Sequence, residues 1–175
     1  VILKPAEATP LMALELARIF EQAGLPAGLL SVLPGKGSVI GDALARHPKV
    51  RKISFTGGTT TGRHLAHVAA EKLIPASLEL GGKSPTIVLE DADIEQAARG
   101  ICYGIFSPAG QACIAGSRLF IHESIYAPLM SRLLELTRGL RVGHPLPDGT
   151  QLGPLTNPKD RQTRPEERRE GTESR

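Results

Sequence analysis

Short apolar runs alternate with helical patterns through the first half of the chain, and glycine-containing turns separate them. Val1–Leu3, Leu29–Leu33 and Lys52–Thr56 have the length and composition of strands, and Val1–Leu3 is expected to be buried. This alternation predicts right-handed βαβ units on a parallel sheet. Tryptophan is absent and aromatic residues make up 3% of the 175 residues, so the core has to be aliphatic. The sequence therefore predicts an α/β fold with helices flanking a parallel sheet.

Residues that favour helix ends mark the expected helix boundaries. Thr9, just before Pro10, predicts the start of the first helix, and Gly24 predicts its end. Either Asp91 or Asp93 is expected to cap a later helix, and Ser124 is expected to cap the helix after that one. At each start, a side-chain oxygen would accept a hydrogen bond from an N–H group of the first turn.

The pattern changes near Gly81-Gly82, which two strand-like segments flank. We place a domain boundary near Leu78–Gly82, with one domain over residues 1–78 and the next over residues 79–158. From Thr156 to Arg175 the chain has no aliphatic or aromatic residue, so we expect residues 159–175 to be a disordered polar tail. The alternative is that this tail is an out-of-frame or truncated end.

Composition and charge argue against several classes of protein. The net charge of +3 comes without a pattern of interleaved basic and aromatic residues, which argues against nucleic-acid binding. No apolar run approaches the ~18 residues of a membrane span, and the first residues do not read as a signal peptide. Two cysteines, Cys102 and Cys113, make no disulfide framework, so we expect a reducing compartment, the cytoplasm. Because the chain starts in a strand-like run without Met, we expect a fragment.

A glycine-rich turn between a predicted strand and a predicted helix, Gly57–Gly62, is a candidate phosphate cradle. Free backbone N–H groups and the helix dipole would favour an anion at this turn, whose candidate residues are Gly57, Gly58 and Gly62. A plain turn before a helix is the alternative. Arg63 follows where a P-loop needs Lys-Ser/Thr, so this turn is not a P-loop.

Lys4 and Glu7 lie on either side of a proline just after the first predicted strand. The lysine can donate to a ribose hydroxyl or phosphate, and the glutamate can accept from a ribose hydroxyl. A carboxylate there would repel a 2′-phosphate, which would favour NAD over NADP. An exposed charged turn is the alternative. Because ligands bind beyond the carboxyl ends of parallel strands, we expect Lys4, Gly37 and Gly57–Gly62 to lie close together.

Cys113 lies among small residues in Gly110–Arg118, and Glu79 lies upstream in an apolar setting. A nucleophilic thiol and a carboxylate that activates water are the minimum set for covalent acyl chemistry. The alternatives are a structural thiol and a surface glutamate. Cys102 follows a helical apolar pattern and is expected to be a packed core thiol. The histidines show no metal-ligand spacing with the cysteines, so we expect no metal site.

These segments, taken together and in order, resemble the aldehyde dehydrogenase superfamily. The motifs that carry the resemblance are Lys4-Pro5-Ala6-Glu7, Phe55–Arg63, Leu78–Pro85 and Gly110–Arg118. The resemblance covers Val1 to about Pro158. It implies a Rossmann-like parallel sheet with flanking helices, in the C-terminal part of an NAD-binding domain, followed by the start of a second α/β catalytic domain.

The resemblance also implies residue roles and a reaction. Cys113 matches the nucleophile and Glu79 the general base. The positions that match the cofactor site are Lys4 and Glu7 at the adenosine ribose, Gly58 under the pyrophosphate and Leu80 near the nicotinamide. The implied reaction oxidises a small-molecule aldehyde to a carboxylic acid through a cysteine thioester, with NAD as cofactor and NADP as the alternative. The parent enzyme is expected to be a homo-oligomer with no nucleic-acid or membrane partner.

Three departures from the family pattern bear on these expectations. One is Ser107-Pro108-Ala109, which replaces the more usual residues before Gly110. The upstream segment with the asparagine of the oxyanion hole is absent, and so is everything after the first part of the catalytic domain. We therefore expect this chain to be inactive alone. A CoA-acylating dehydrogenase is the alternative within the fold, and Glu79 argues against it because that branch has less need of a water-activating base. A non-catalytic remnant that at most binds nucleotide or a partner is the alternative from another class.

Overall fold

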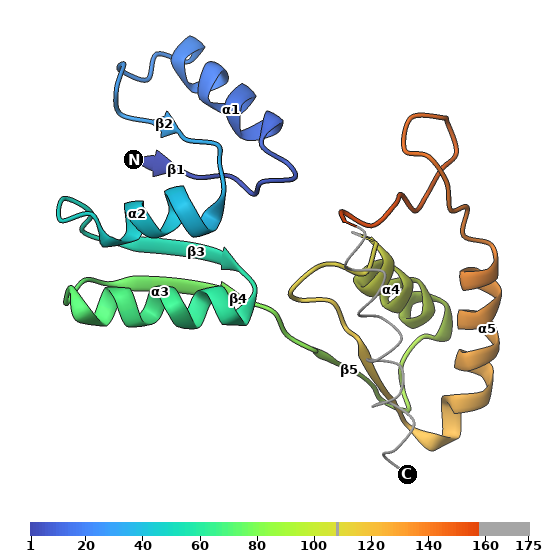
Figure 1. The fold of residues 1–175 in the computed structure, drawn as a ribbon. Helices are drawn as coiled ribbons and strands as arrows, with labels where there is room; N and C mark the ends of the chain where they lie inside the picture. The colour runs from blue at the N-terminus through green and yellow to red at the C-terminus, as the bar shows by residue number, and fades with distance from the viewer. Residues whose placement is uncertain (108, 158–175) are drawn as a thin grey trace. The chain divides into compact units, whose positions relative to one another are not determined.

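Strands and helices alternate along the chain, as the sequence predicts (Figure 1). The computed structural model describes residues 1–107 and 109–157. The predicted polar tail, residues 159–175, lies outside the described residues. The chain divides into a first unit, Val1–Glu79, and a second unit that begins at Leu80.

The first unit consists of helices that alternate with short strands. In chain order its elements are β1 (Ile2–Leu3), α1 (Leu11–Gln22), β2 (Ser31–Val32), a π-helical turn (Gly37–Gly41), α2 (Asp42–Arg46), β3 (Ile53–Gly57), α3 (Thr59–Glu71) and β4 (Ala76–Leu80). β1 pairs with β2 in parallel, and β3 lies beside β4 in a second pair. The α/β class is confirmed, with the strands arranged in pairs where the sequence predicted one sheet.

The core of the first unit is small and aliphatic. Its buried hydrophobic cluster consists of Ala45, Ile53, Val68 and Ala69. No residue of α1 is buried, and the first strand-like run is also open, with Val1 88% and Ile2 51% exposed. The prediction that Val1–Leu3 is buried is therefore wrong for this structure, because the buried cluster takes its residues from α2, β3 and α3 alone.

A lysine just after α3 fastens that helix to the end of α2. The Nζ of Lys72 donates to the backbone carbonyls of Ala45 at 2.8 Å, His47 at 2.7 Å and Val50 at 3.2 Å. An ammonium group has three donors, so these carbonyls satisfy all of them. Ala45 lies in the last turn of α2, where a carbonyl has no partner within the helix, so the contact holds the end of α2 against α3 beside the buried cluster.

The second unit has two strands and two long helices. Its elements are β5 (Pro85–Val88), α4 (Ile94–Phe106), β6 (Arg118–Ile121), a 3₁₀ turn (Glu123–Ile125) and α5 (Tyr126–Arg138). β5 and β6 pair in parallel, with Pro85 opposite Arg118 and Val88 opposite Ile121. α4 and α5 run side by side (Figure 1), and the buried core consists of Val88, Ala98, Ile101 and Leu129.

Two predicted helix boundaries are confirmed. Oδ1 of Asp93 accepts the N–H of Gln96 at 2.8 Å, which identifies Asp93 as the cap of α4 among the two candidates. Gly24 follows α1 with φ +91°, a conformation that glycine adopts without strain. The N–H of Leu25 then donates to the carbonyl of Phe20 at 2.9 Å and closes the helix end.

Two other predicted caps are wrong. Pro10 takes the N-cap position of α1 with φ −81° and ψ −21°, while the N–H of Thr9 turns back to the carbonyl of Ala6 at 3.3 Å. Ser124 lies inside the 3₁₀ turn before α5, and its own N–H donates to Nδ1 of His122 at 3.4 Å. In both places an extra turn precedes the helix, so the candidate residue lies too early to cap it.

A charged network joins α4 to α5. Arg132 donates to both carboxylate oxygens of Glu95, from Nε at 2.6 Å and from a terminal nitrogen at 2.9 Å. Nε of Arg99 donates to Glu95 at 2.6 Å, and Arg132 also pairs with Glu135 at 2.7 Å. The hydrogen bonds from Arg132, and then from Arg99, lower the pKa of Glu95 from its usual 4.5 to about 2.

The Glu95 network should make the stability of the chain depend on pH in the acid range. Because the folded pKa of about 2 lies below the usual 4.5, the unfolded chain binds more protons between these values. We expect the contribution of Glu95 to be complete above about pH 4.5 and to be lost as the pH falls toward about 2. Urea unfolding of the wild-type and Glu95→Gln chains should show a larger difference in midpoint at neutral pH than at acid pH, and high salt should reduce it. The same difference at both pH values would contradict the assignment.

Candidate active site

Lys4, Glu7 and Gly37 come together beyond the ends of β1 and β2. Oε1 of Glu7 accepts the backbone N–H of Gly37 at 2.7 Å. Nζ of Lys4 donates to the carbonyl of Pro5 at 2.6 Å, and its aliphatic stem packs near Gly41, where an added Cβ would lie 3.4 Å from Lys4 Cδ. The structure therefore brings together three of the residues that the sequence assigned to the cofactor site.

The Gly57–Gly62 turn joins the end of β3 to the start of α3. Gly57 is the last residue of β3, and a Cβ there would lie 2.6 Å from the ring of Phe55. Gly58 is extended, with φ −70° and ψ 145°, and it takes the N-cap position of α3. The N–H of the buried Gly62 donates to its carbonyl at 3.0 Å. Because Gly58 has no side chain to cap the helix, an anion can approach the N–H groups of the first turn.

Cys113 is exposed in the loop between α4 and β6, and glycines determine how this loop packs. A Cβ on Gly82 would lie 3.3 Å from the carbonyl oxygen of Cys113. A Cβ on Gly116 would collide with the side chain of Thr86 on β5. Gly82, which belongs to the Leu78–Pro85 motif, thus lies against the Cys113 loop. Glu79 itself is exposed on β4, at the end of the first unit.

A contact across 45 residues ties the Cys113 loop to a later segment. Oε1 of Gln111 accepts both the backbone N–H of Thr156 at 3.1 Å and its hydroxyl at 3.2 Å. Before the loop, Ala109 adopts φ +53° and Gly110 φ +73°, so two successive residues have left-handed backbone. Sequence reasoning missed the anchoring role of Gln111, because nothing in the spacing relates it to Thr156.

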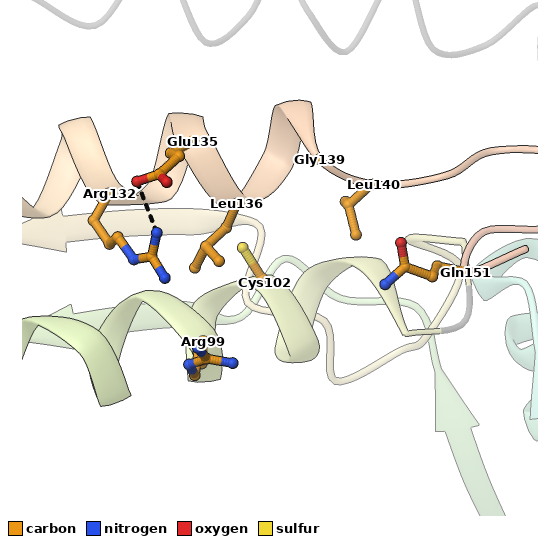
Figure 2. Close-up of a pocket in the computed structure, with 8 residues that line it drawn as sticks. All are labelled: Arg99, Cys102, Arg132, Glu135, Leu136, Gly139, Leu140 and Gln151. Atoms are coloured by element: carbon orange, nitrogen blue, oxygen red, sulfur yellow. Dashed lines mark ion pairs between the residues drawn. The ribbon is translucent and has the colours of Figure 1, made fainter. Parts of the chain in front are cut away.

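A groove between α4 and α5 encloses about 420 Å³ and contains the other cysteine (Figure 2). Its lining residues are Arg99, Cys102, Arg132, Glu135, Leu136, Gly139, Leu140 and Gln151. The Cys102 side chain extends from α4 toward Leu136 of α5 (Figure 2). Cys102 is half-buried in this wall, so the prediction of a packed core thiol is wrong, because the groove leaves one side of the thiol open. Neither Cys113 nor Glu79 lines the groove.

None of the helices within residues 1–107 and 109–157 is long and apolar enough to cross a membrane. Among the same residues, no group of three or more His, Cys, Asp or Glu side chains is arranged to hold a metal ion.

Comparison with known proteins identifies the family. The aldehyde dehydrogenase family model matches residues 1–173, and the chain therefore belongs to that family. A phenylacetaldehyde dehydrogenase from Pseudomonas fluorescens is 51% identical over 159 residues, which are 91% of this chain and 32% of that enzyme. The chain spans about a third of the length of this curated relative.

Solved structures of similar proteins agree with this membership. PnpE from Pseudomonas sp. WBC-3 is 43% identical, with a TM-score of 0.88 over 92% of this chain and 33% of its own. It has also been solved in complex with nicotinamide adenine dinucleotide. An NAD-dependent aldehyde dehydrogenase from Sinorhizobium meliloti is 41% identical, with a TM-score of 0.90 over 93% of this chain and 32% of its own.

The contact between Gly82 and Cys113 generates a prediction with a matched control. Gly82→Ala adds a Cβ 3.3 Å from the Cys113 carbonyl, so the loop has to shift, at a cost of about 1–2 kcal/mol in stability. Gly81→Ala adds a Cβ with nothing within 4 Å. In a Cys102→Ala background, iodoacetamide should label Cys113 at a changed rate in the Gly82→Ala variant and at the wild-type rate in the Gly81→Ala variant. Equal labelling of both variants would show that Gly82 does not position the loop.

Proposed function

We propose that the natural protein to which these residues belong oxidises an aldehyde to a carboxylic acid through a thioester on Cys113. The observation that supports this most is the exposed thiol of Cys113, in a loop whose backbone packs against Gly82 of the Glu79 motif. Membership of the aldehyde dehydrogenase family supplies the reaction class. Because the chain spans about a third of its relatives, the complete activity is a proposal about the natural protein.

The proposed chemistry uses the two site residues in turn. The Cys113 thiolate adds to the aldehyde carbonyl and forms a tetrahedral hemithioacetal, whose oxyanion can accept the backbone N–H of Cys113. Bound NAD⁺ would supply the hydride acceptor, and loss of hydride leaves Cys113 as a thioester. Glu79 then takes a proton from water, which attacks the thioester carbonyl and releases the carboxylic acid and the free thiol. Covalent catalysis thus separates the oxidation from the hydrolysis.

The residues of the first unit fit a nicotinamide dinucleotide. Glu7 offers a carboxylate that can accept from a ribose hydroxyl, Lys4 offers an ammonium group, and Gly37 lies beside both. The backbone of Gly57, Gly58 and Gly62 leads into the N-terminus of α3, where a pyrophosphate would be favoured. Leu80 would place backbone near the nicotinamide. We propose NAD as the cofactor, with NADP as the alternative.

We propose that residues 1–78 are part of the NAD-binding domain and that residues 79–158 are the start of the catalytic domain. The division of the structure between Glu79 and Leu80 supports this assignment. We also propose that the natural protein is a cytoplasmic homo-oligomer that acts on a small-molecule aldehyde, and two cysteines without a disulfide fit a reducing compartment.

Replacing each cysteine separately tests the nucleophile. In the natural protein, Cys113→Ala should lower aldehyde-dependent NADH formation by about 10³-fold or more, because the variant lacks the sulfur that would form the thioester. Cys102→Ala should keep near-normal activity, because Cys102 lies in the groove between α4 and α5. Steady-state assays and iodoacetamide inactivation measure both variants. Full activity of the Cys113→Ala protein would refute the proposed mechanism.

Replacing Glu79 separates oxidation from hydrolysis. Glu79→Gln should lower the steady-state rate by about 10²-fold or more while the first turnover of NADH persists, because water activation follows hydride loss. Stopped-flow absorbance gives the first turnover, and product analysis with and without CoA identifies the acceptor. Free acid is the expected product. Acyl-CoA formation that is insensitive to Glu79→Gln would instead support a CoA-acylating enzyme.

A further inference from the structure

The hydrogen bond between Glu7 and Gly37 joins the two strand-end segments of the proposed cofactor site. We propose that the backbone N–H of Gly37 is a positioning group, which holds the Glu7 carboxylate in place and so enforces selection of NAD over NADP. This inference rests on the proposed function, since it takes Glu7 as the acceptor for the adenosine ribose.

The N–H of Gly37 is available because of its position in the π-helical turn. Gly37 is the first residue of that turn, and the hydrogen bonds of the turn begin with the N–H groups of Val39 and Ile40, which donate to the carbonyl of Lys36. A first-turn N–H has no partner within its own helix. The Glu7 carboxylate, 30 residues earlier in the chain, takes this donor at 2.7 Å. This distance is typical of a strong bond between an N–H and an ionised carboxylate.

The contact leaves the second carboxylate oxygen of Glu7 for a ligand. Among the residues that the structure describes, neither a hydrogen bond nor an ion pair reaches Oε2 of Glu7, and Lys4 directs its Nζ to the Pro5 carbonyl. Lys4 therefore forms no ion pair with Glu7 in the described part of the chain. A ribose hydroxyl can donate to Oε2, whereas a 2′-phosphate would bring like charge against it.

Because the Glu7 carboxylate is held in place, its repulsion of a 2′-phosphate would select NAD over NADP. A free glutamate could rotate away from a 2′-phosphate at small cost. Here rotation would break the bond to Gly37 and leave its N–H without a partner, so the enzyme would lose that hydrogen bond each time it accepted NADP. The preference for NAD should therefore depend on Gly37 as well as on the charge of Glu7.

Two substitutions at Gly37 separate the N–H from the side chain. Gly37→Pro removes the donor, and the proline ring takes the place of the hydrogen that Glu7 accepts. Proline suits the first position of a helical turn, and Lys36, with φ −64° and ψ 130°, has the conformation that precedes proline. Gly37→Ala keeps the donor, and its Cβ would make ordinary contacts, 3.7 Å from Glu7 Oε1 and 3.9 Å from Lys4 Cε.

Calorimetric titration of the natural protein with NAD and with NADP provides the test. Gly37→Pro should weaken NAD binding by about tenfold and reduce the ratio of NADP to NAD dissociation constants by a similar factor. Gly37→Ala should keep that ratio, whatever its effect on absolute affinity. Glu7→Asp is a second test, because a shorter carboxylate cannot reach the Gly37 N–H, and it should reduce the ratio as Gly37→Pro does. Circular dichroism checks that each variant folds.

The outcomes distinguish this inference from the proposed function. A wild-type ratio in both Gly37→Pro and Glu7→Asp would overturn the positioning role while leaving the cofactor site intact. Failure of the wild-type protein to bind either nucleotide would refute the cofactor site itself, and the inference with it. A loss of the ratio in Gly37→Ala equal to that in Gly37→Pro would also overturn it, because alanine retains the N–H.

Discussion

Parallel pairing of β5 with β6 is the constraint on which the candidate catalytic loop depends. Parallel strands begin at the same edge of a sheet, so the segments that precede them meet there. Gly82 precedes β5 and Cys113 precedes β6, and the register from Pro85–Arg118 to Val88–Ile121 brings these segments into contact. The contact is close because Gly82 and Gly116 have no Cβ.

In the first unit, parallel pairing brings together the segments that follow two strands. β1 and β2 pair in parallel, and the segments that follow them contain Glu7 and Gly37. Parallel strands also end at the same edge, which lets a side chain from one segment bond the backbone of the other. Two short ladders thus position both sets of candidate residues.

Neither ladder is stabilised by a large core. Among the described residues, a cluster of four buried aliphatic residues lies in the first unit and another cluster of four in the second, and both units also use polar contacts between helices. Lys72 joins α3 to the end of α2, and Glu95 joins α4 to α5 through two arginines. Because the Glu95 network is partly exposed, its contribution is screened by salt, and packing of the aliphatic clusters contributes the larger share.

The sequence by itself determined the order of elements, the α/β class and the motifs of the site. Periodicity and glycine turns are local signals, and they placed β3 and the Gly24 helix end within a residue or two. The caps at Thr9 and Ser124 were wrong because a turn inserted before a helix has no clear local signature. Tertiary structure alone decided which distant residues meet: Glu7 with Gly37, Gly82 with Cys113, and Gln111 with Thr156. Such pairs follow from strand register and loop packing, which depend on the whole fold and leave no periodic trace in the chain.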